Sequence, residues 1–125
     1  MKILVAENSN FIRKTIVDAI SSITGIRAIL ESTSVSDALS GYSMFDPNVV
    51  ILAYKLIGGN SMDLLEAIKA AGNKTMVIVI ADSCSPQVRK QCLNEGAHHV
   101  LNVSKDIERI TGILSDYSKD SNQAA

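Results

Sequence analysis

Five short runs of apolar residues recur along the chain, with more polar stretches between them. Runs of this length, rich in Val, Ile and Leu and with little polar alternation, are typical of strands that are covered on both faces. We therefore expect a parallel sheet with helices on both sides. The runs are ILVA (3–6), IRAIL (26–30), VVILA (49–53), MVIVIA (76–81) and HVLNV (99–103).

Helical patterns fill the intervals between these runs. The clearest covers residues 9–24, where apolar residues of helical period follow a cap at Asn8 or Ser9. The other four helices are predicted from caps, terminal glycines and apolar spacing. They run from Ser34 to about Tyr42, from Ser61 to Gly72, from Ser85 and Pro86 to Gly96, and along the stripe Ile107, Ile110, Leu114 and Tyr117.

Strict alternation of strand and helix predicts right-handed crossovers and an open, doubly wound sheet. We expect an α/β fold of the flavodoxin-like (βα)5 type, a three-layer sandwich whose parallel strands have the order 2-1-3-4-5. In such sheets ligands bind beyond the carboxyl ends of the strands, where the strand order reverses. Glu7, Asn8 and Ala53 are expected to meet at that point.

Length and charge describe one ordinary globular domain. The chain has 125 residues, 46% hydrophobic content and a net charge of -1, so no basic excess favours direct binding to nucleic acid or to a membrane surface. No apolar stretch approaches the roughly 18 residues that a membrane span needs, and no signal-peptide core is present, which indicates a cytoplasmic location. Residues 1–118 form the expected domain, and 119–125 a flexible tail or the start of a linker.

Cysteine and histidine are poorly placed for chemistry. Cys84 and Cys92 make a poor disulfide framework or zinc site, and reduced structural thiols are expected. His98 and His99 are adjacent in a predicted strand, where neighbouring side chains point to opposite faces, so a joint metal site with Cys84 is disfavoured. A nucleophilic Cys served by a His would also lack an oxyanion hole that the sequence marks.

The order of these pieces resembles the receiver domain of bacterial response regulators over residues 2–118. In that family an acid pair after strand one holds Mg²⁺, an Asp at the end of strand three accepts a phosphoryl group, and a Thr or Ser ends strand four. An aromatic residue lies in strand five and a Lys-Pro pair follows it. The resemblance is carried by MKILVAENSNFIRKTI (1–16), DPNVVILAYKLIGGNSMDLLEAIK (46–69), MVIVIADS (76–83) and EGAHHVL (95–101).

The resemblance places unusual residues in the phosphorylation pocket. The acid pair becomes Glu7 and Asn8, the acceptor Asp becomes Ala53, and the hydroxyl position is Ala81. A methyl group cannot attack phosphorus. Lys55 lies two residues beyond the acceptor position, and its cation could lean toward Glu7 in place of Mg²⁺. With Glu7 as the single carboxylate, Mg²⁺ binding is expected to be weak or absent.

Strand five departs from the family as well. The aromatic position is Val100, the Lys position is Val103, and Ser104 replaces the Pro. Lys105 comes two residues late, and the sequence leaves open whether it reaches the pocket. Five departures in one pocket indicate a degenerate receiver, or pseudo-receiver, with no catalytic, cofactor-binding or metal-binding residues.

The predicted function is therefore a non-enzymatic signal-transduction module that binds another protein independently of phosphorylation. The partner would be a histidine kinase or an effector domain, and a homodimer through the fourth and fifth helices is a further option. The expected partner face contains Arg89, Lys90, Val100, Lys105 and Arg109.

Other readings remain open beside this one. One is a working phosphorelay receiver that a histidine kinase phosphorylates at a non-standard residue, although Asp46, Asp63 and Ser83 each fit structural roles better. Another is an interaction or scaffold protein that differs only in its partner. Flavin and cobalamin binding are disfavoured because the first loop, AENSNF (6–11), lacks a Ser/Thr/Gly-rich run and no Asp-x-His-x-x-Gly motif occurs.

Overall fold

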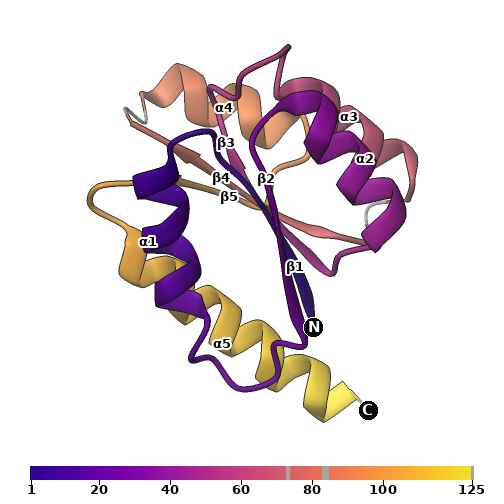
Figure 1. The fold of residues 1–125 in the computed structure, drawn as a ribbon, viewed down its shortest axis with the longest axis vertical. Coiled ribbons are helices and arrows are strands. Elements are labelled where there is room, and N and C mark those ends of the chain that lie inside the picture. Colours follow the sequence, from indigo (N-terminus) through magenta and orange to yellow (C-terminus); the bar gives the residue numbers. More distant parts are fainter. Residues whose placement is uncertain (73, 83–84, 125) are drawn as a thin grey trace.

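Strands and helices alternate along the whole chain. The computed structural model describes residues 1–72, 74–82 and 85–124, and within them five parallel strands form one sheet of order β2-β1-β3-β4-β5 (Figure 1). The predicted flavodoxin-like fold and its strand order are confirmed. The strands are β1 (Lys2–Ala6), β2 (Ala28–Ser32), β3 (Val49–Ala53), β4 (Met76–Ala81) and β5 (His99–Asn102), and the helices are α1 (Asn10–Ile20), α2 (Val35–Phe45), α3 (Met62–Ala70), α4 (Pro86–Asn94) and α5 (Ile107–Ala124).

The helices cover both faces of the sheet. Figure 1 shows α1 and α5 on one side and α2, α3 and α4 on the other. Successive strand residues point to opposite faces, so β3 sends Ile51 into the α1/α5 side and Leu52 into the α2/α3/α4 side, and both are fully buried. Each face therefore has its own apolar layer, and the central strands contribute to both.

The strand register brings the carboxyl ends of the central strands level with one another. Ala6 pairs with Leu52, Ala53 with Ile80, and Ala81 with Asn102. Consequently the residues that follow β1, β3, β4 and β5 emerge at the same edge of the sheet. This edge is where the sequence places the ligand site.

Side-chain caps fix the starts of three helices. Ser9 Oγ accepts a hydrogen bond from Ile12 N at 3.2 Å, Ser34 Oγ from Asp37 N at 3.1 Å, and Ser85 Oγ from Val88 N at 3.2 Å. These three predicted caps are confirmed. Ser61 is not a side-chain cap, because its hydroxyl donates to the carbonyl of Tyr54.

Several element boundaries differ from the prediction, most clearly those of β2 and α1. β2 is Ala28–Ser32 instead of 26–30, because it is an edge strand whose register is set by pairing with β1, from Lys2 with Ala28 to Ala6 with Ser32. α1 ends at Ile20, short of the predicted residue 24.

The last helix is longer than its apolar stripe predicts. α5 continues to Ala124, so the backbone is helical through 119–124, where fraying was expected. No Gly or Pro interrupts this segment, so the backbone can continue as a helix. Whether 119–125 is a tail or the start of a linker stays a prediction. None of the helices in the described part of the chain is long and apolar enough to cross a membrane.

Candidate functional site: a cavity at the carboxyl edge of the sheet

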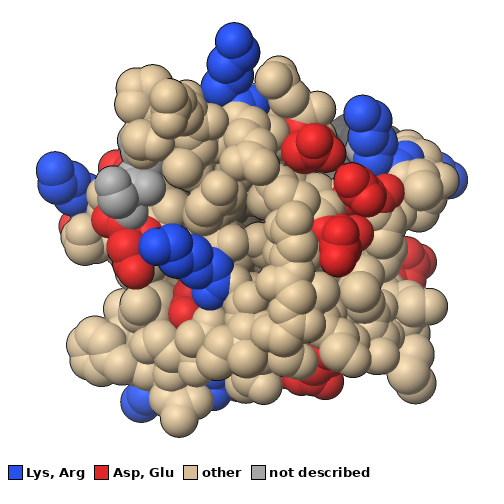
Figure 2. Space-filling view, turned by 90° about the horizontal axis from the view of Figure 1, so that it is seen from above, with Lys and Arg blue, Asp and Glu red and all other residues tan. Residues whose placement is uncertain are grey.

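A cavity of about 440 Å³ opens at the carboxyl ends of β1, β3 and β4. Figure 2 looks down on this edge of the molecule, where acidic and basic side chains lie interspersed around a hollow. Five of the six residues predicted for the degenerate pocket line it. The lining consists of Glu7, Asn8, Ser9, Ile12, Ala53, Tyr54, Lys55, Ala81, Asp82, Ser85 and Val88.

Methyl groups form part of the cavity wall where a phosphorylated receiver would present oxygen atoms. Ala53 ends β3 and Ala81 ends β4, and their exposed fractions are 4% and 7%. Ile12 and Val88 add further apolar lining. Neither strand end therefore offers a nucleophile or a hydroxyl to the cavity.

Glu7 brings a buried carboxylate to this apolar surface. Its exposed fraction is 7%, and its Oε1 accepts a hydrogen bond from Ser9 N at 3.0 Å. Burial raises the pKa of Glu7 above its ordinary value, and the Asp82 carboxylate raises it further, whereas the Ser9 N–H and the Arg13 charge lower it. The net direction is upward, so burial outweighs the stabilising contacts.

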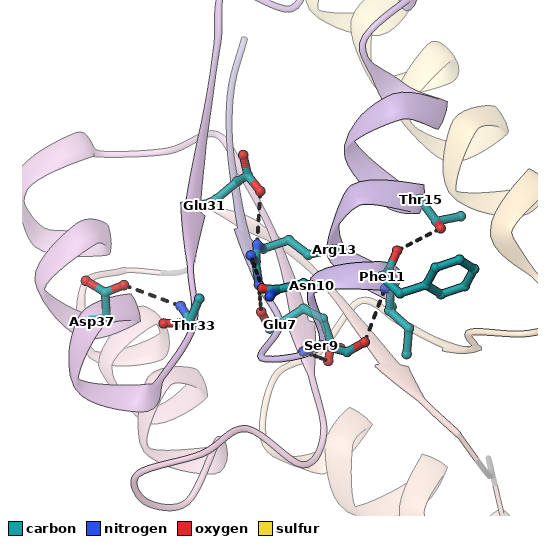
Figure 3. A network of polar contacts seen from close by, with 10 residues as sticks. Glu7, Ser9, Asn10, Phe11, Arg13, Thr15, Glu31, Thr33 and Asp37 are labelled. Carbon is teal, nitrogen blue, oxygen red and sulfur yellow. Dashed lines mark hydrogen bonds and ion pairs between the residues drawn. The ribbon is translucent and has the colours of Figure 1, made fainter.

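Arg13 is close to Glu7 but is occupied elsewhere (Figure 3). Its Nε donates to Glu31 Oε1 at 2.9 Å, and its two terminal nitrogens donate to the Glu7 main-chain carbonyl at 2.8 Å and to Asn10 Oδ1 at 2.6 Å. The guanidinium thus ties the start of α1 to β2 and to the end of β1. It makes no ion pair with the Glu7 carboxylate.

Asn8 presents an acceptor without a donor. Its Oδ1 atom is buried and has no hydrogen-bond partner within the described residues. A buried, unpartnered carbonyl oxygen costs free energy, so a ligand or water that donates a hydrogen bond to it would be stabilised. Asn8 stands where the family has its second acid.

Asp82 is a cavity residue that the sequence analysis overlooked. It follows β4 directly, and the Asn102 Nδ2 atom donates a hydrogen bond to its main-chain carbonyl at 3.3 Å. The expectation of a single carboxylate in the pocket is therefore wrong, because Glu7 and Asp82 both line it. The signal in the sequence was an acid directly after an apolar run, at the edge where ligands bind.

Lys55 lines the cavity from the segment after β3, but its side chain is exposed. The two ion pairs in the described part of the chain join Arg13 to Glu31 and Lys14 to Asp18. The suggested lean of Lys55 onto Glu7 is therefore not formed. An exposed Lys would lose hydration and side-chain freedom by reaching into the cavity, so such a pair gains little.

Val103 and Lys105 lie outside the cavity lining. Val103 packs against the apolar layer under α1 and α5, and Lys105 is exposed. Asn102 organises this loop, because its Oδ1 accepts hydrogen bonds from Ser104 N, Ser104 Oγ and Lys105 N at 3.0, 2.7 and 3.2 Å. Asn102 thus organises the geometry of this loop. Val103, which occupies the family's Lys position, does not line the cavity.

Tyr54 links the cavity to α4. Its hydroxyl donates to Gln91 Oε1 at 2.8 Å, and its main-chain carbonyl accepts from the Ser61 hydroxyl. The ring packs against the apolar layer under α2, α3 and α4. Sequence reasoning missed this residue, because its role depends on a helix that is distant along the chain.

The residues present fit a resident Mg²⁺ ion poorly. No group of three or more His, Cys, Asp or Glu side chains within residues 1–72, 74–82 and 85–124 is arranged to hold a metal. Mg²⁺ prefers near-octahedral oxygen coordination, and the wall beside Glu7 and Asp82 presents the methyl groups of Ala53 and Ala81 in place of oxygen ligands.

The predicted partner face is only partly at the surface. Arg89 and Lys90 on α4 and Lys105 and Arg109 near the start of α5 are exposed. Val100 has an exposed fraction of 1% and is part of a core layer, so it cannot contact a partner. That residue is withdrawn from the predicted face, because a central position in a covered strand points into the core.

Cysteine and histidine have structural positions. Cys92 is buried in the layer under α2, α3 and α4, while Cys84, like Ser83, lies outside the described residues. His98 precedes β5, and its Nδ1 accepts a hydrogen bond from Val77 N at 3.0 Å. Burial lowers the pKa of His99, and the charges of His98 and Arg109 add to this effect. His98 therefore supports the amino end of the sheet, away from the cavity.

A three-layer α/β domain with this strand order, and with a polar cavity where the order reverses, is a flavodoxin-like domain with a site for a small group or ligand. The model of the response regulator receiver domain family matches residues 3–114. The chain belongs to this family. Receiver domains of response regulators are generally non-enzymatic signalling modules that interact with kinases and effector domains.

Solved structures agree on the fold. The signal receiver domain of the response regulator NarL from Mycobacterium tuberculosis is 22% identical, with a TM-score of 0.84 over 94% of this chain and 95% of that one. A DNA-binding response regulator of the LuxR family from Staphylococcus aureus is 19% identical, with a TM-score of 0.83 over 94% and 98%. The response regulator domain of Thermotoga maritima CheB is 17% identical, with a TM-score of 0.78 over 96% and 94%. A search of curated proteins finds no match.

Proposed function

We propose that this receiver domain works by binding another protein and does so without being phosphorylated. The observation that carries the proposal is the pair of methyl groups at the ends of β3 and β4. Ala53 supplies no oxygen to accept a phosphoryl group, and Ala81 supplies no hydroxyl to hold one. The family's cation is also missing from the cavity, since Val103 and Lys105 do not line it.

The partner is proposed to be a histidine kinase or an effector domain that contacts the surface of α4 and α5. Four exposed cations lie there, namely Arg89, Lys90, Lys105 and Arg109. These four cations would favour a partner that presents acidic side chains to them, through complementary charge and faster association. The same surface would serve a homodimer only if these charges were neutralised.

Capture from the native cell tests this surface. The double variant R89E/K90E is expected to lose a partner that the unaltered protein retains, because two repulsive charges replace two attractive ones. Lys74→Glu, which alters an exposed charge just before β4, is the control and should capture that partner normally. Equal recovery with all three proteins would show that the partner binds another face.

Phosphorylation is tested by the intact mass of the protein after incubation with acetyl phosphate and Mg²⁺. The proposal expects an unchanged mass. An added phosphoryl group that is lost in base would overturn it, because acyl phosphates hydrolyse readily under those conditions.

A second candidate is a phosphorelay receiver that uses a non-standard acceptor, and Asp82 is the observation that favours it. This carboxylate lines the cavity, is exposed, and lies one residue beyond Ala81. Labelling that disappears in Asp82→Asn but persists in Asp63→Asn, an exposed acid in the first turn of α3, would establish this alternative.

A further inference from the structure

We propose that the cavity at the carboxyl edge of the sheet binds a small organic cation, an ammonium or guanidinium group on a short apolar chain. The proposal concerns a ligand of this domain and does not rest on the proposed mode of partner binding. It stands on three features of the lining: a buried amide oxygen without a donor, carboxylates without an ion-pair partner, and an apolar wall beside them.

Two lining acceptors come from consecutive residues after β1. The Glu7 carboxylate receives one hydrogen bond, from Ser9 N, and Asn8 Oδ1 receives none from the described residues although it is buried. A carboxylate and a carbonyl oxygen accept hydrogen bonds and do not donate them. The complementary ligand is therefore a donor, and a positively charged donor forms the stronger hydrogen bonds.

The described part of the chain does not supply this cation itself. Arg13 is directed to Glu31, to Asn10 and to the Glu7 carbonyl, so its guanidinium is already used. Lys55 lines the cavity but forms no ion pair with Glu7. The carboxylates of Glu7 and Asp82 thus face the cavity without a bound positive charge.

The remaining lining suits a hydrocarbon. Ala53, Ala81, Ile12 and Val88 present apolar groups to a cavity of about 440 Å³, a size within the range of small-molecule sites. A hydrated metal ion gains nothing from methyl groups, whereas an alkyl chain is stabilised by leaving water. A cation with a short hydrocarbon chain uses both parts of the lining at once.

The test is a titration followed by amide chemical shifts, with n-butylammonium as the probe and n-butanol and butyrate as isosteric controls. We expect butylammonium to shift amides of the cavity residues with a millimolar dissociation constant, as its few atoms allow. Butanol and butyrate should bind at least tenfold more weakly, because one lacks the charge and the other reverses it.

Two variants separate the charge from the shape of the cavity. Glu7→Gln keeps the size of the side chain and is expected to weaken butylammonium binding at least tenfold. Lys55→Met removes the competing cation and should strengthen binding several-fold. Glu66→Gln, which removes an exposed carboxylate on α3 outside the cavity, is the matched control and should bind like the unaltered protein.

Three results would overturn the proposal. One is butanol binding as tightly as butylammonium, which would mean that only the apolar wall matters. Another is a response to MgCl₂ with none to butylammonium, which would identify a metal site. The third is the same affinity in Glu7→Gln and in the unaltered protein, provided that the amide spectrum shows both to be folded.

Discussion

At the scale of single residues, the cavity is lined by side-chain oxygen atoms after β1 and by methyl groups at the ends of β3 and β4. Glu7 remains ionisable in a poorly solvated position, and Asp82 adds a like charge nearby. Ala53 and Ala81 take the places where the family holds an acceptor and a hydroxyl. The cavity therefore holds carboxylates after β1 and after β4, but the ends of β3 and β4 present methyl groups to it.

The burial of Glu7 predicts a pH-dependent stability. Its folded-state pKa lies above the ordinary value of 4.5, so the native protein binds this proton more readily than the unfolded chain does. The ionised form therefore lowers the free energy of unfolding at neutral pH, and this loss disappears as the pH falls through the raised pKa. The Ser9 N–H and the Arg13 charge partly offset this loss, whereas the Asp82 carboxylate increases it.

We expect Glu7→Gln to be more stable than the unaltered protein at neutral pH and equally stable below pH 4.5. Urea unfolding at several pH values measures this difference. Glu66→Gln, which neutralises an exposed carboxylate, is the control. Asp37 is less suitable because its carboxylate accepts a hydrogen bond from Thr33 N. A stability gain that is the same at every pH would contradict the burial argument.

Restoring the acceptor alone should not restore phosphorylation. Ala53→Asp supplies the nucleophile, but Ala81 still lacks a hydroxyl and Val103 still lacks a cation. The intact mass after acetyl phosphate and Mg²⁺ is expected to stay unchanged. Substantial labelling of this single variant would show that Asp82, Asn8 or Lys55 supplies what we consider missing.

At the scale of elements, side-chain caps and one loop asparagine position the site. Ser9 caps α1 beside the cavity, and Asn102 holds both the β5–α5 loop and the carbonyl of Asp82. Ser9 accepts from a main-chain N–H at the start of α1, while Asn102 accepts from main-chain N–H groups of its loop and donates to the carbonyl that follows β4. The cavity lining therefore depends on residues outside the family's pocket motif.

Ser9→Ala is expected to lower the free energy of unfolding by about 1 kcal/mol, because the Ile12 N–H loses its acceptor. Chemical denaturation measures the loss. Ser40→Ala, at an exposed position within α2, provides the control and should be neutral or slightly stabilising, since Ala favours a helix. Equal losses in both variants would refute the capping role.

Asn102→Ala is expected to cost about 2 kcal/mol, because its side chain makes several hydrogen bonds to the loop. The substitution should also change the amide chemical shift of Asp82, because the Asn102 side chain donates a hydrogen bond to the Asp82 carbonyl. Asn94→Ala, at the exposed end of α4, is the comparison. Shifts confined to the β5–α5 loop would show that Asn102 does not position Asp82.

The sequence predicts the elements well where burial alone decides them. β3, Val49–Ala53, is apolar throughout and buried, and its bounds match the prediction residue for residue. β2 was misplaced because an edge strand is defined by its hydrogen-bonded neighbour, which the sequence does not show. The site was predicted through the resemblance at Glu7, Asn8, Ala53 and Ala81.

The remaining errors at the site concern contacts between distant segments. Asp82 and Tyr54 are absent from the family's pocket motif, and the packing of Val103 in the core depends on the whole β5–α5 loop. Val100 was assigned to a surface although β5 is covered on both faces. Such assignments require the spatial arrangement of elements, which apolar spacing does not provide.

At the scale of the whole molecule, one sheet joins two apolar layers. Ile51 and Leu52 are neighbours in β3, yet they belong to opposite layers. The three tyrosines are divided between the layers as well, with Tyr42 and Tyr54 on one side and Tyr117 on the other. Because the central strand is shared, we expect the two layers to unfold together.

Ile51→Ala and Leu52→Ala should each lower the free energy of unfolding by about 2–5 kcal/mol, as truncation of a fully buried side chain does. Urea titrations followed by tyrosine fluorescence and by far-ultraviolet circular dichroism measure this. The two probes should give coincident transitions in both variants. Transitions that do not coincide would contradict unfolding in a single step.

The alanine at the end of β3 also has a consequence in time. In a receiver that forms an acyl phosphate, hydrolysis of that phosphate limits the lifetime of the signal, even while the partner is still bound. Ala53 cannot form an acyl phosphate, so no hydrolysis step at this position can end the signal. Under the proposed function, the signal lasts as long as the complex with the partner, so the dissociation rate of the partner sets the lifetime of the signal.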